Sequence, residues 1–371
     1  MFDKKMSFLI GNEVYNSQKP LVIAELGTSH NADPVKAREM IAAAAEAGAD
    51  CIKFQMVFAD EILHPNTGEV TLPGGKIRLY DRFKTLETPV EFYTALKEYV
   101  ELKGLLFLCT PFGMKSARIL RDLEPKIVKI ASPELNYTSL LEEISGWRLP
   151  VLLSTGVSLL ADIEEAVSIL KKGNQLCLLH CVTSYPAPET EYNLRLLQSL
   201  SAIFGVPVGV SDHTLDPQLI PALALSMGAS VIEKHFCLSR TDPGLDDPIA
   251  LPPELFSKMV KTVRQAAEAG PDKTLEFFRQ ERGEKLVEQV LGNGVKELSH
   301  SEKSNYRLTN RSIHAVRNIK AGEIIKNGDF AVLRTEKVLR PGLEPRFESF
   351  IAGRTARNFI PAGEGIRFQD I

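Results

Sequence analysis

Two stretches of the chain end in closely similar polar sequences. The stretch Val206–His213 is apolar until its last three residues, and the stretch Ser230–Phe236 has the same design, with His235 near its end. Each histidine has an acidic residue near it in the sequence that could orient the ring. Imidazole is a common ligand of divalent transition metals, and second-shell carboxylates often fix its orientation. The pair therefore predicts a two-histidine metal site, provided that both histidines face one cavity.

A set of parallel strands would place the two histidines together. Most of the candidate strands are continuous apolar runs, as expected for parallel strands that are covered on both faces. We expect eight: Leu21–Leu26, Cys51–Gln55, Leu105–Cys109, Ile127–Ala131, Val151–Ser154, Leu176–Cys181, Val206–Val210 and Ser230–Phe236.

Helical patterns separate most of these strands, and several end at a glycine. The expected helices are Asp33–Ala47, Pro89–Lys103, Lys115–Leu123, Ala161–Lys172, Leu194–Phe204, Pro217–Met227 and Pro253–Ala269. Eight strand–helix units over about 250 residues match a TIM (β/α)8 barrel. A doubly wound sheet is the alternative, but no GxGxxG sequence follows the first strand.

The pattern of the chain predicts four parts. Residues 1–20 form a lead-in hairpin, 21–280 the barrel, 281–310 a polar linker and 311–371 a small β-rich domain. Residues 57–88 make an unusually long loop after the second strand, and long loops of this kind are often lids. A domain of about sixty residues is marginal alone, so we expect it to dock on another surface.

Polar residues cluster where the predicted strands end, which is where TIM barrels place their active sites. Two lysines with several hydroxyls suit a phosphate or carboxylate group, because they combine fixed positive charge with short donors. The strand-end residues include Glu25, Lys53, Gln55, Thr110, Lys129, Ser132, Glu134, Ser154, Thr183, Tyr185 and Ser211. Together with the histidine pair they predict an anionic, phosphorylated substrate and a metal-polarised oxygen.

Composition excludes several other classes of protein. The formal net charge of −3 argues against nucleic-acid binding, and no apolar run is long enough to span a bilayer. The five cysteines fall in or just after apolar runs without CxxC spacing, which is typical of reduced core thiols. We therefore expect a cytoplasmic protein that has no membrane or nucleic-acid partner.

The strand-end motifs resemble those of the sialic acid (N-acylneuraminate) synthase family. The motifs are Ile23–Gly27 with Ser29–Asn31, Ile52–Gln55, Thr110–Phe112, Lys129–Ser132 with Glu134, Leu153–Gly156, His180–Cys181 with Tyr185–Pro186, Ser211–Thr214 and Glu233–Phe236. The tail sequences Asn310–Ile313 and Lys320–Glu323 look like the family's antifreeze-like (SAF) domain. The resemblance covers the whole barrel, and the later tail is similar to the spore-coat-polysaccharide branch.

The resemblance implies that phosphoenolpyruvate condenses with an N-acetylated amino sugar, such as N-acetylmannosamine, to give a sialic-type 2-keto acid and phosphate. It implies a divalent metal on His213 and His235, Mn²⁺ first, with Mg²⁺ or Co²⁺ as alternatives. It also implies a domain-swapped homodimer. Carried over by position, Lys53, Thr110, Lys129, Ser132, Ser154, Thr183 and Ser211 hold phosphoenolpyruvate, while Glu25, Gln55, Glu134, Tyr185, Asp246 and Arg311 serve the sugar and the proton transfers.

Departures from the family pattern fall where the sugar would bind. Asp247 and Ala250 stand where the family has His or Ser and Ser, and Ala32 replaces a glycine. The acceptor sugar therefore stays open. Two other functions also stay open: a Schiff-base pyruvate aldolase that uses Lys53 or Lys129, and a non-catalytic carbohydrate-binding barrel.

Overall fold

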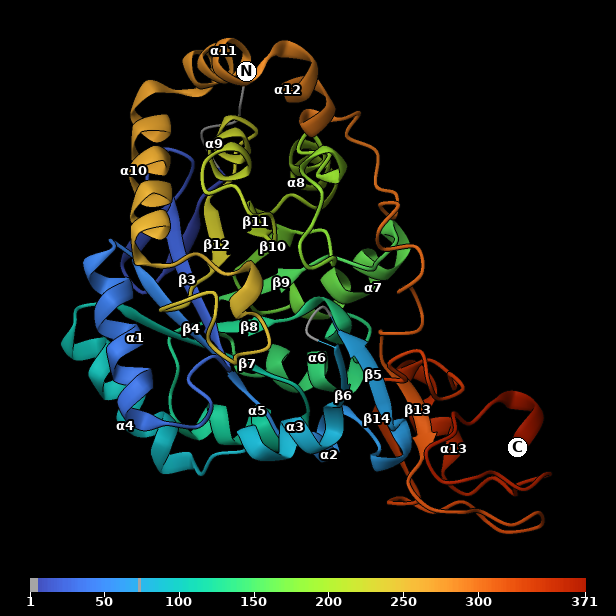
Figure 1. Cartoon of the computed structure of the whole chain (residues 1–371). Helices are drawn as coiled ribbons and strands as arrows, with labels where there is room; N and C mark the ends of the chain where they lie inside the picture. Colours follow the sequence, from blue (N-terminus) through green and yellow to red (C-terminus); the bar gives the residue numbers. More distant parts are fainter. Residues whose placement is uncertain (1–5, 73–74) are drawn as a thin grey trace.

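The computed structural model describes residues 6–72 and 75–371, and its centre is a barrel of eight parallel strands (Figure 1). The strands run in the order β7-β4-β3-β12-β11-β10-β9-β8, and β7 contacts β8 at the seam. Their bounds are β3 (Leu21–Gly27), β4 (Cys51–Met56), β7 (Leu106–Pro111), β8 (Val128–Ile130), β9 (Val151–Ser154), β10 (Leu176–His180), β11 (Val208–Asp212) and β12 (Val231–His235). The TIM barrel prediction is confirmed, and the doubly wound sheet is wrong.

Helices cover the outside of the barrel. They are α1 (Pro34–Glu46), α4 (Val90–Leu102), α5 (Met114–Asp122), α6 (Thr138–Ser145), α7 (Leu160–Leu170), α8 (Leu196–Phe204), α9 (Leu219–Ser226) and α10 (Pro253–Ala269). Asp33 caps α1 by accepting from the backbone N–H groups of Val35 and Lys36, as its position before a proline suggests. Helix α6 is absent from the predicted helices, because its eight residues are too few for a clear apolar period.

The lead-in forms a hairpin that closes the end of the barrel at which the strands begin. Strands β1 (Phe8–Ile10) and β2 (Glu13–Tyr15) pair antiparallel. Phe8, Ile10 and Tyr15 pack against inward-facing side chains of the barrel strands, so apolar groups fill that end of the interior. The opposite end, where the strands finish, is left for polar side chains.

The long loop after β4 has its own secondary structure. It contains α2 (Ala59–Ile62), the 3₁₀ turn η1 (Pro65–Thr67), the antiparallel strands β5 (Glu69–Leu72) and β6 (Gly75–Arg78), and α3 (Leu79–Leu86). An apolar cluster that includes Ile62, Val70 and Leu79 packs it onto Phe112 after β7. The loop is therefore a fixed wall beside the strand ends.

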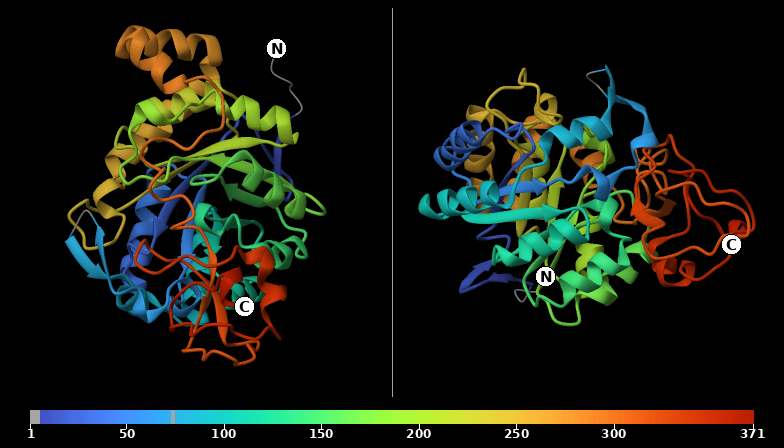
Figure 2. Two further views of the ribbon diagram at one scale, coloured as in Figure 1. Left: turned by 90° about the vertical axis from the view of Figure 1, so that its right-hand side faces the viewer. Right: turned by 90° about the horizontal axis from the view of Figure 1, so that it is seen from below.

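The predicted linker is partly helical. Helix α11 (Pro271–Arg282) ends inside it, and α12 (Glu284–Leu291) follows after Gly283, so the extended part begins only after residue 291. In Figure 1 this part descends along the outside of the barrel to the small domain, and the left view of Figure 2 shows that domain at the opposite end of the molecule from α11 and α12.

The small domain has little regular secondary structure. Strands β13 (Ser312–Ala315) and β14 (Phe330–Leu333) pair antiparallel, and isolated bridges join His314 to Gly365 and Ile319 to Ile360. The small domain also contains α13 (Glu348–Ile351) and the 3₁₀ turns η5 (Pro345–Phe347) and η6 (Phe368–Asp370). Three further 3₁₀ turns lie in the loops of the barrel: η2 (Ser132–Glu134), η3 (Glu189–Glu191) and η4 (Asp247–Ile249).

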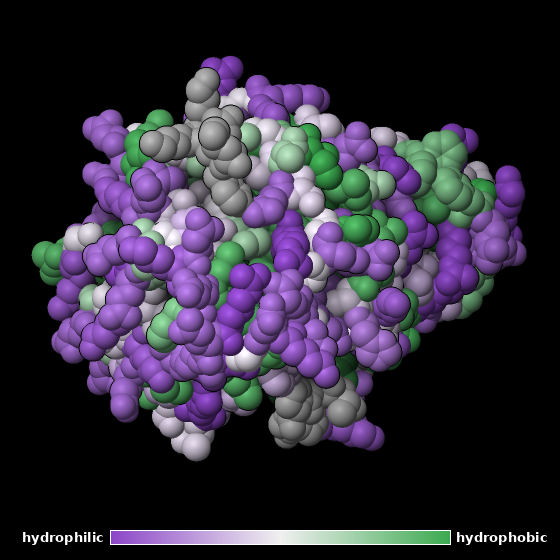
Figure 3. Space-filling model, turned by 90° about the horizontal axis from the view of Figure 1, so that it is seen from above, coloured by the Kyte–Doolittle hydropathy of each residue, from purple (hydrophilic) through white to green (hydrophobic). Residues whose placement is uncertain are grey.

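The surface is mixed in polarity. The face seen in Figure 3 carries mainly hydrophilic side chains, with hydrophobic ones in separate small groups, which is typical of a surface in contact with water. None of the helices that the structure describes is long and apolar enough to cross a membrane.

Candidate active site

A cavity of about 620 Å³ lies at the carboxyl ends of the strands, and its volume suits a small substrate. It is lined by most of the residues predicted from the sequence: Glu25, Lys53, Gln55, Lys129, Ser132, Ser154, Thr183, Tyr185, Ser211, His213, His235 and Asp246. Thr110, Glu134 and Arg311 do not line it. Residues from six of the eight strands, together with residues of the loops that follow strands, therefore meet in one site.

Strand register explains why these side chains meet. His235 of β12 pairs with Glu25 of β3, and Glu25 pairs with Lys53 of β4. Successive side chains of a strand point to opposite faces, so Glu233 and His235 face the cavity while Lys234 points outward. There Lys234 donates to Asp212 Oδ2 at 2.6 Å, which ties β12 to β11 behind the site.

A cluster of four charged groups forms the floor of the cavity. Lys53 Nζ lies 3.2 Å from Glu25 and 3.1 Å from Glu233, and Lys129 Nζ lies 3.6 Å from Glu233. Burial opposes the charge of Lys53, but the two carboxylates outweigh it and raise the pKa of Lys53. Burial and the neighbouring Lys53 lower the pKa of Lys129.

The pKa values of the two carboxyl groups in this cluster are shifted in opposite directions. Burial disfavours the charge of Glu233, but Lys129 and Lys53 outweigh it and lower its pKa to about 2. Burial raises the pKa of Glu25 to about 7 against the pull of Lys53, and the charge of Glu233 adds to the rise. Glu233 therefore carries the negative charge that the lysines share, and Glu25 is the carboxyl group that can exchange a proton near neutral pH.

Buried hydroxyl groups surround the lysines. Within the part of the chain that the structure describes, the hydroxyls of Ser154, Thr183 and Thr110 have no hydrogen-bond partner. Ser132 Oγ accepts from the N–H of Gly156 at 3.0 Å. Buried donors without partners are costly, so the hydroxyls of Ser154 and Thr183, which line the cavity, indicate a ligand with acceptor oxygens in it; Thr110 does not line the cavity.

The two histidines lie side by side in the lining of the cavity, with ring centroids 5.5 Å apart. His213 Nδ1 lies 2.8 Å from the carbonyl oxygen of Val182 and must donate to it, so Nε2 is the unprotonated nitrogen, 3.4 Å from Ser211 Oγ and 3.5 Å from the hydroxyl of Tyr185. Burial lowers the pKa of His213 and of His235 to about 3, so both rings are neutral. Tyr185 stacks on His213 at a centroid distance of 4.4 Å.

These features fit a divalent ion, because a neutral imidazole can offer its unprotonated nitrogen to such an ion in place of the long contacts to Ser211 and Tyr185. Among the described residues, however, no group of three or more His, Cys, Asp or Glu side chains is arranged to hold a metal. The histidines are thus two protein ligands at most, and water or substrate oxygens would complete the set.

Glu134 lies behind the cavity wall instead of in it. Its Oε1 atom accepts from Arg311 Nε at 3.0 Å and from Arg334 Nη2 at 2.5 Å. Arg311 is fully buried and also donates to the carbonyl oxygens of Glu61 and Phe112, at 2.5 Å each. In the described chain, Arg311 therefore fastens the small domain to its own barrel.

Sequence reasoning missed several residues that line the cavity: Glu69, Phe83, Asn305, Thr309, Arg334, Glu336 and Lys337. They come from the loop after β4, from the linker and from the small domain. Their only sequence signal is that these segments are expected to form a lid and to dock.

The loop after β12 shapes one side of the site. Leu245 and Asp246 line the cavity, and burial raises the pKa of Asp246 to about 6. Asp247 is buried and accepts from the N–H of Gly244 at 2.7 Å, so it stabilises the loop. Asp247 is thus a structural residue of the loop, at the position where the sequence departs from the family pattern.

Comparison with protein families finds two matches. The pattern described as the NeuB family matches residues 40–274, and the SAF domain pattern matches residues 310–371. Together they cover most of the barrel and the whole small domain.

Similar proteins extend along nearly the whole chain. The spore coat polysaccharide biosynthesis protein SpsE of Bacillus subtilis is 34% identical, over 98% of this chain and 97% of its own. The N,N'-diacetyllegionaminic acid synthase of Campylobacter jejuni is 32% identical, over 92% of this chain and 97% of its own. The crystal structure of the Bacillus subtilis protein superposes with a TM-score of 0.82 and covers 98% of this chain and 99% of that one.

Proposed function

The chain belongs to the NeuB family and is an enzyme of its synthase type, and we propose that it joins phosphoenolpyruvate to the open-chain aldehyde of an N-acetylated amino sugar. The products are a nonulosonic 2-keto acid and phosphate. The observation that carries the proposal is the cavity itself, which is lined by two lysines, by hydroxyls without partners and by a pair of neutral histidines.

Phosphoenolpyruvate suits the lysine side of the cavity. Lys129, Ser154 and Thr183 would take the phosphate, with fixed charge and short donors, and Lys53 would take the carboxylate. Binding there satisfies the hydroxyls that otherwise lack partners. The same cations stabilise the phosphate as it leaves.

His213 and His235 would hold the divalent ion on the acceptor side. When bound, such an ion polarises the aldehyde oxygen and makes its carbon electrophilic. The stacked Tyr185 and the nearby Asp246 flank this position, and His235 Nδ1 lies 3.9 Å from Asp246 Oδ2.

The reaction needs a group that takes and returns protons. The alkene carbon of phosphoenolpyruvate bonds to the aldehyde carbon, water adds at C2, and the C2–O bond to phosphate breaks. The water loses two protons, one on addition and one as the ketone forms; the aldehyde oxygen gains one of them and the departing phosphate the other. Glu25 suits this exchange because it lines the cavity with a pKa of about 7, whereas Glu134 is held behind the wall by Arg311.

A homodimer is also part of the proposal. The covalent connection between the small domain and the barrel is the linker alone. In this structure Arg311 of the small domain contacts Glu134 of the same chain. The same contact can form between two chains if the domains exchange, because exchange re-uses existing contacts. Mixing an Arg311→Ala chain with a Lys129→Ala chain should then restore part of the activity. If a verified heterodimer shows no recovery of activity, the contact between Arg311 and Glu134 forms only within one chain.

The proposal is tested by phosphate release from phosphoenolpyruvate with Mn²⁺ against a panel of N-acetylated hexosamines and their 6-deoxy, diamino relatives. Release that depends on one of these sugars supports the synthase and identifies the acceptor. Borohydride trapping of a lysine with pyruvate would instead favour the Schiff-base aldolase, for which the lowered pKa of Lys129 makes it the candidate amine. Release that no sugar in the panel stimulates would count against the proposal.

A further inference from the structure

Side chains of the linker hydrogen-bond to the backbones of two barrel loops, the loop after β9 and the loop after β10. Glu302 Oε1 accepts from the N–H of Val157 and from the N–H of Thr183, each at 2.8 Å. Asn310 donates to the carbonyl oxygen of Val157 at 3.1 Å, and Asn305 donates to that of Thr183 at 3.1 Å. Linker side chains thus satisfy the N–H and the C=O of one residue in each loop.

These two loops carry part of the proposed phosphate site. Thr183 lines the cavity itself, and Val157 follows β9, whose last residue is Ser154. Between them, a Cβ atom at Gly156 would lie 2.1 Å from Thr183 Oγ1 and 2.7 Å from Cys181 Sγ. The loops are therefore packed against each other without room for a side chain, and a shift in one is transmitted to the other.

The backbone at Val157 needs an external hold. Its φ of 43° lies in the left-handed region, which is unfavourable for a β-branched residue. Strain of this kind persists only where the surroundings enforce it. The surroundings that enforce it here are the hydrogen bond that the N–H of Val157 donates to Glu302 and the one that its carbonyl oxygen accepts from Asn310.

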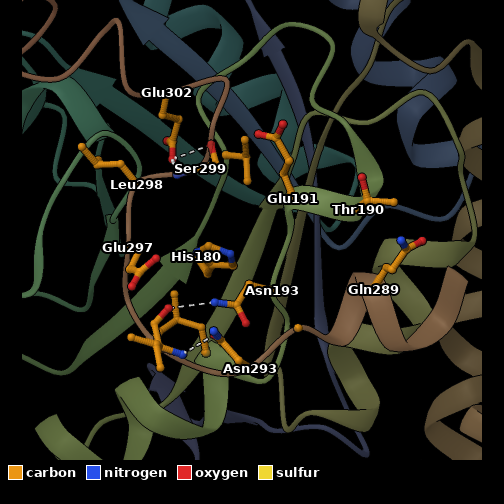
Figure 4. Close-up of a pocket in the computed structure, with 14 residues that line it drawn as sticks. His180, Thr190, Glu191, Asn193, Gln289, Asn293, Glu297, Leu298, Ser299 and Glu302 are labelled. Atoms are coloured by element: carbon orange, nitrogen blue, oxygen red, sulfur yellow. Dashed lines mark hydrogen bonds between the residues drawn. The ribbon is translucent and has the colours of Figure 1, made fainter. Parts of the chain in front are cut away.

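Glu302 is built into its position. It is buried, and its Oε2 atom accepts from Ser299 Oγ at 3.1 Å. Figure 4 shows it above His180 at the edge of a second cavity of about 420 Å³, with Ser299 beside it on the same stretch of linker. A buried carboxylate that accepts several hydrogen bonds is a strong fixed point for the groups that donate to it.

We propose that Glu302 is a positioning residue for the phosphoenolpyruvate end of the active site: it fixes the two loops that present Ser154 and Thr183. The proposal rests on the proposed function. It makes the linker part of the catalytic apparatus as well as a tether for the small domain.

The test compares Glu302→Ala with Glu302→Gln in the full-length protein. Alanine removes the acceptor and leaves two buried N–H groups unpaired, so the KM for phosphoenolpyruvate should rise about tenfold or more, while that for the sugar changes little. Glutamine keeps an oxygen acceptor at the same place and should restore most of the affinity. Glu297→Ala is the matched control, because Glu297 lines the same second cavity but is exposed.

Hydrogen exchange supplies a readout that is independent of activity. In Glu302→Ala, exchange should accelerate in the segments around Val157 and Thr183 and stay unchanged elsewhere. If that variant does not fold, Asn310→Ala, which removes the donor to Val157 and the acceptor of the Arg307 N–H but leaves Glu302 in place, replaces it in both measurements. A folded variant with unchanged affinity for phosphoenolpyruvate, or with both substrates weakened equally, overturns the proposal. Wild-type protein that does not bind phosphoenolpyruvate would defeat the proposed function instead, and exchange would still decide whether Glu302 holds the loops.

Discussion

Arg334 of the small domain and Glu134 of the barrel are joined by two hydrogen bonds to one oxygen, from Nε at 3.1 Å and from Nη2 at 2.5 Å. Arg311 donates to the same oxygen, and both side chains of this second pair are fully buried. Arg334 also lies over the ring of Phe112, 5.3 Å from its centroid, and lines the cavity. The small domain therefore contributes Arg334 and Lys337 to the lining of the site and Arg311 to the wall behind it.

Removing the carboxylate between these arginines should loosen the small domain. Glu134→Ala leaves buried cations uncompensated, which costs about 3–5 kcal/mol. We expect a lower Tm and faster proteolysis in the linker. Arg346→Ala is the control, since Arg346 pairs with Glu165 across the same interface at 3.6 Å but is half exposed, and it should cost about 1 kcal/mol or less. Equal effects of the two substitutions would contradict the central place of Glu134.

Lys129→Ala should weaken the binding of phosphoenolpyruvate far more than the binding of the sugar. A charge-assisted contact contributes roughly 1.5–3 kcal/mol, so the KM for phosphoenolpyruvate should rise about tenfold or more. Steady-state kinetics with each substrate varied in turn measures this. Lys126→Ala, at an exposed neighbouring lysine, should leave both constants unchanged. An equal rise of the KM values for both substrates would show that Lys129 does not bind the phosphate group.

Much of this site is predictable from the sequence, because strand ends of a TIM barrel converge by topology. The pairing of His213 with His235 follows from their positions alone, since each ends an apolar strand and the two strands are consecutive. The floor residues Glu25, Lys53 and Lys129 follow from the same rule, and the structure places all of them on the cavity.

Other features depend on how distant segments dock. Arg334 lies 200 residues from Glu134, and no local period marks it as a residue of the site. Arg311, which the family resemblance assigns to the sugar, lies behind the wall of its own barrel in this chain, because its guanidinium group reaches two backbone carbonyls as well as Glu134. The helical start of the linker escapes prediction, because α12 has only eight residues between Gly283 and Gly292, although its apolar residues have helical spacing.

The pH dependence should report on Glu25. Its pKa is raised to about 7, so as a base it is active above that pH and protonated below it, and kcat/KM should fall as the pH drops through 7. Gln55 donates to Glu25 Oε1 at 2.6 Å and so lowers this pKa. Gln55→Ala should therefore shift the acidic limb to higher pH. A limb that does not move would belong to another group, such as the phosphate of the substrate.

Metal binding should depend on both histidines. His213→Ala or His235→Ala should abolish Mn²⁺ binding by calorimetry and the activity, while circular dichroism stays unchanged. Two protein ligands leave open positions, so the wild-type affinity should be modest. His300→Ala, on the exposed linker, is the control. Full activity of the wild type after exhaustive chelation would refute the metal assignment.

The most direct measurement is mass spectrometry of both products from a reaction run in water labelled with heavy oxygen. If water adds at C2 and the bond from C2 to oxygen breaks, the phosphate carries no label. The sugar should meanwhile gain the three carbons of pyruvate, with one phosphate released for each new 2-keto acid. Labelled phosphate accompanied by free pyruvate would mean that the bond to phosphorus breaks, and would contradict a condensing synthase.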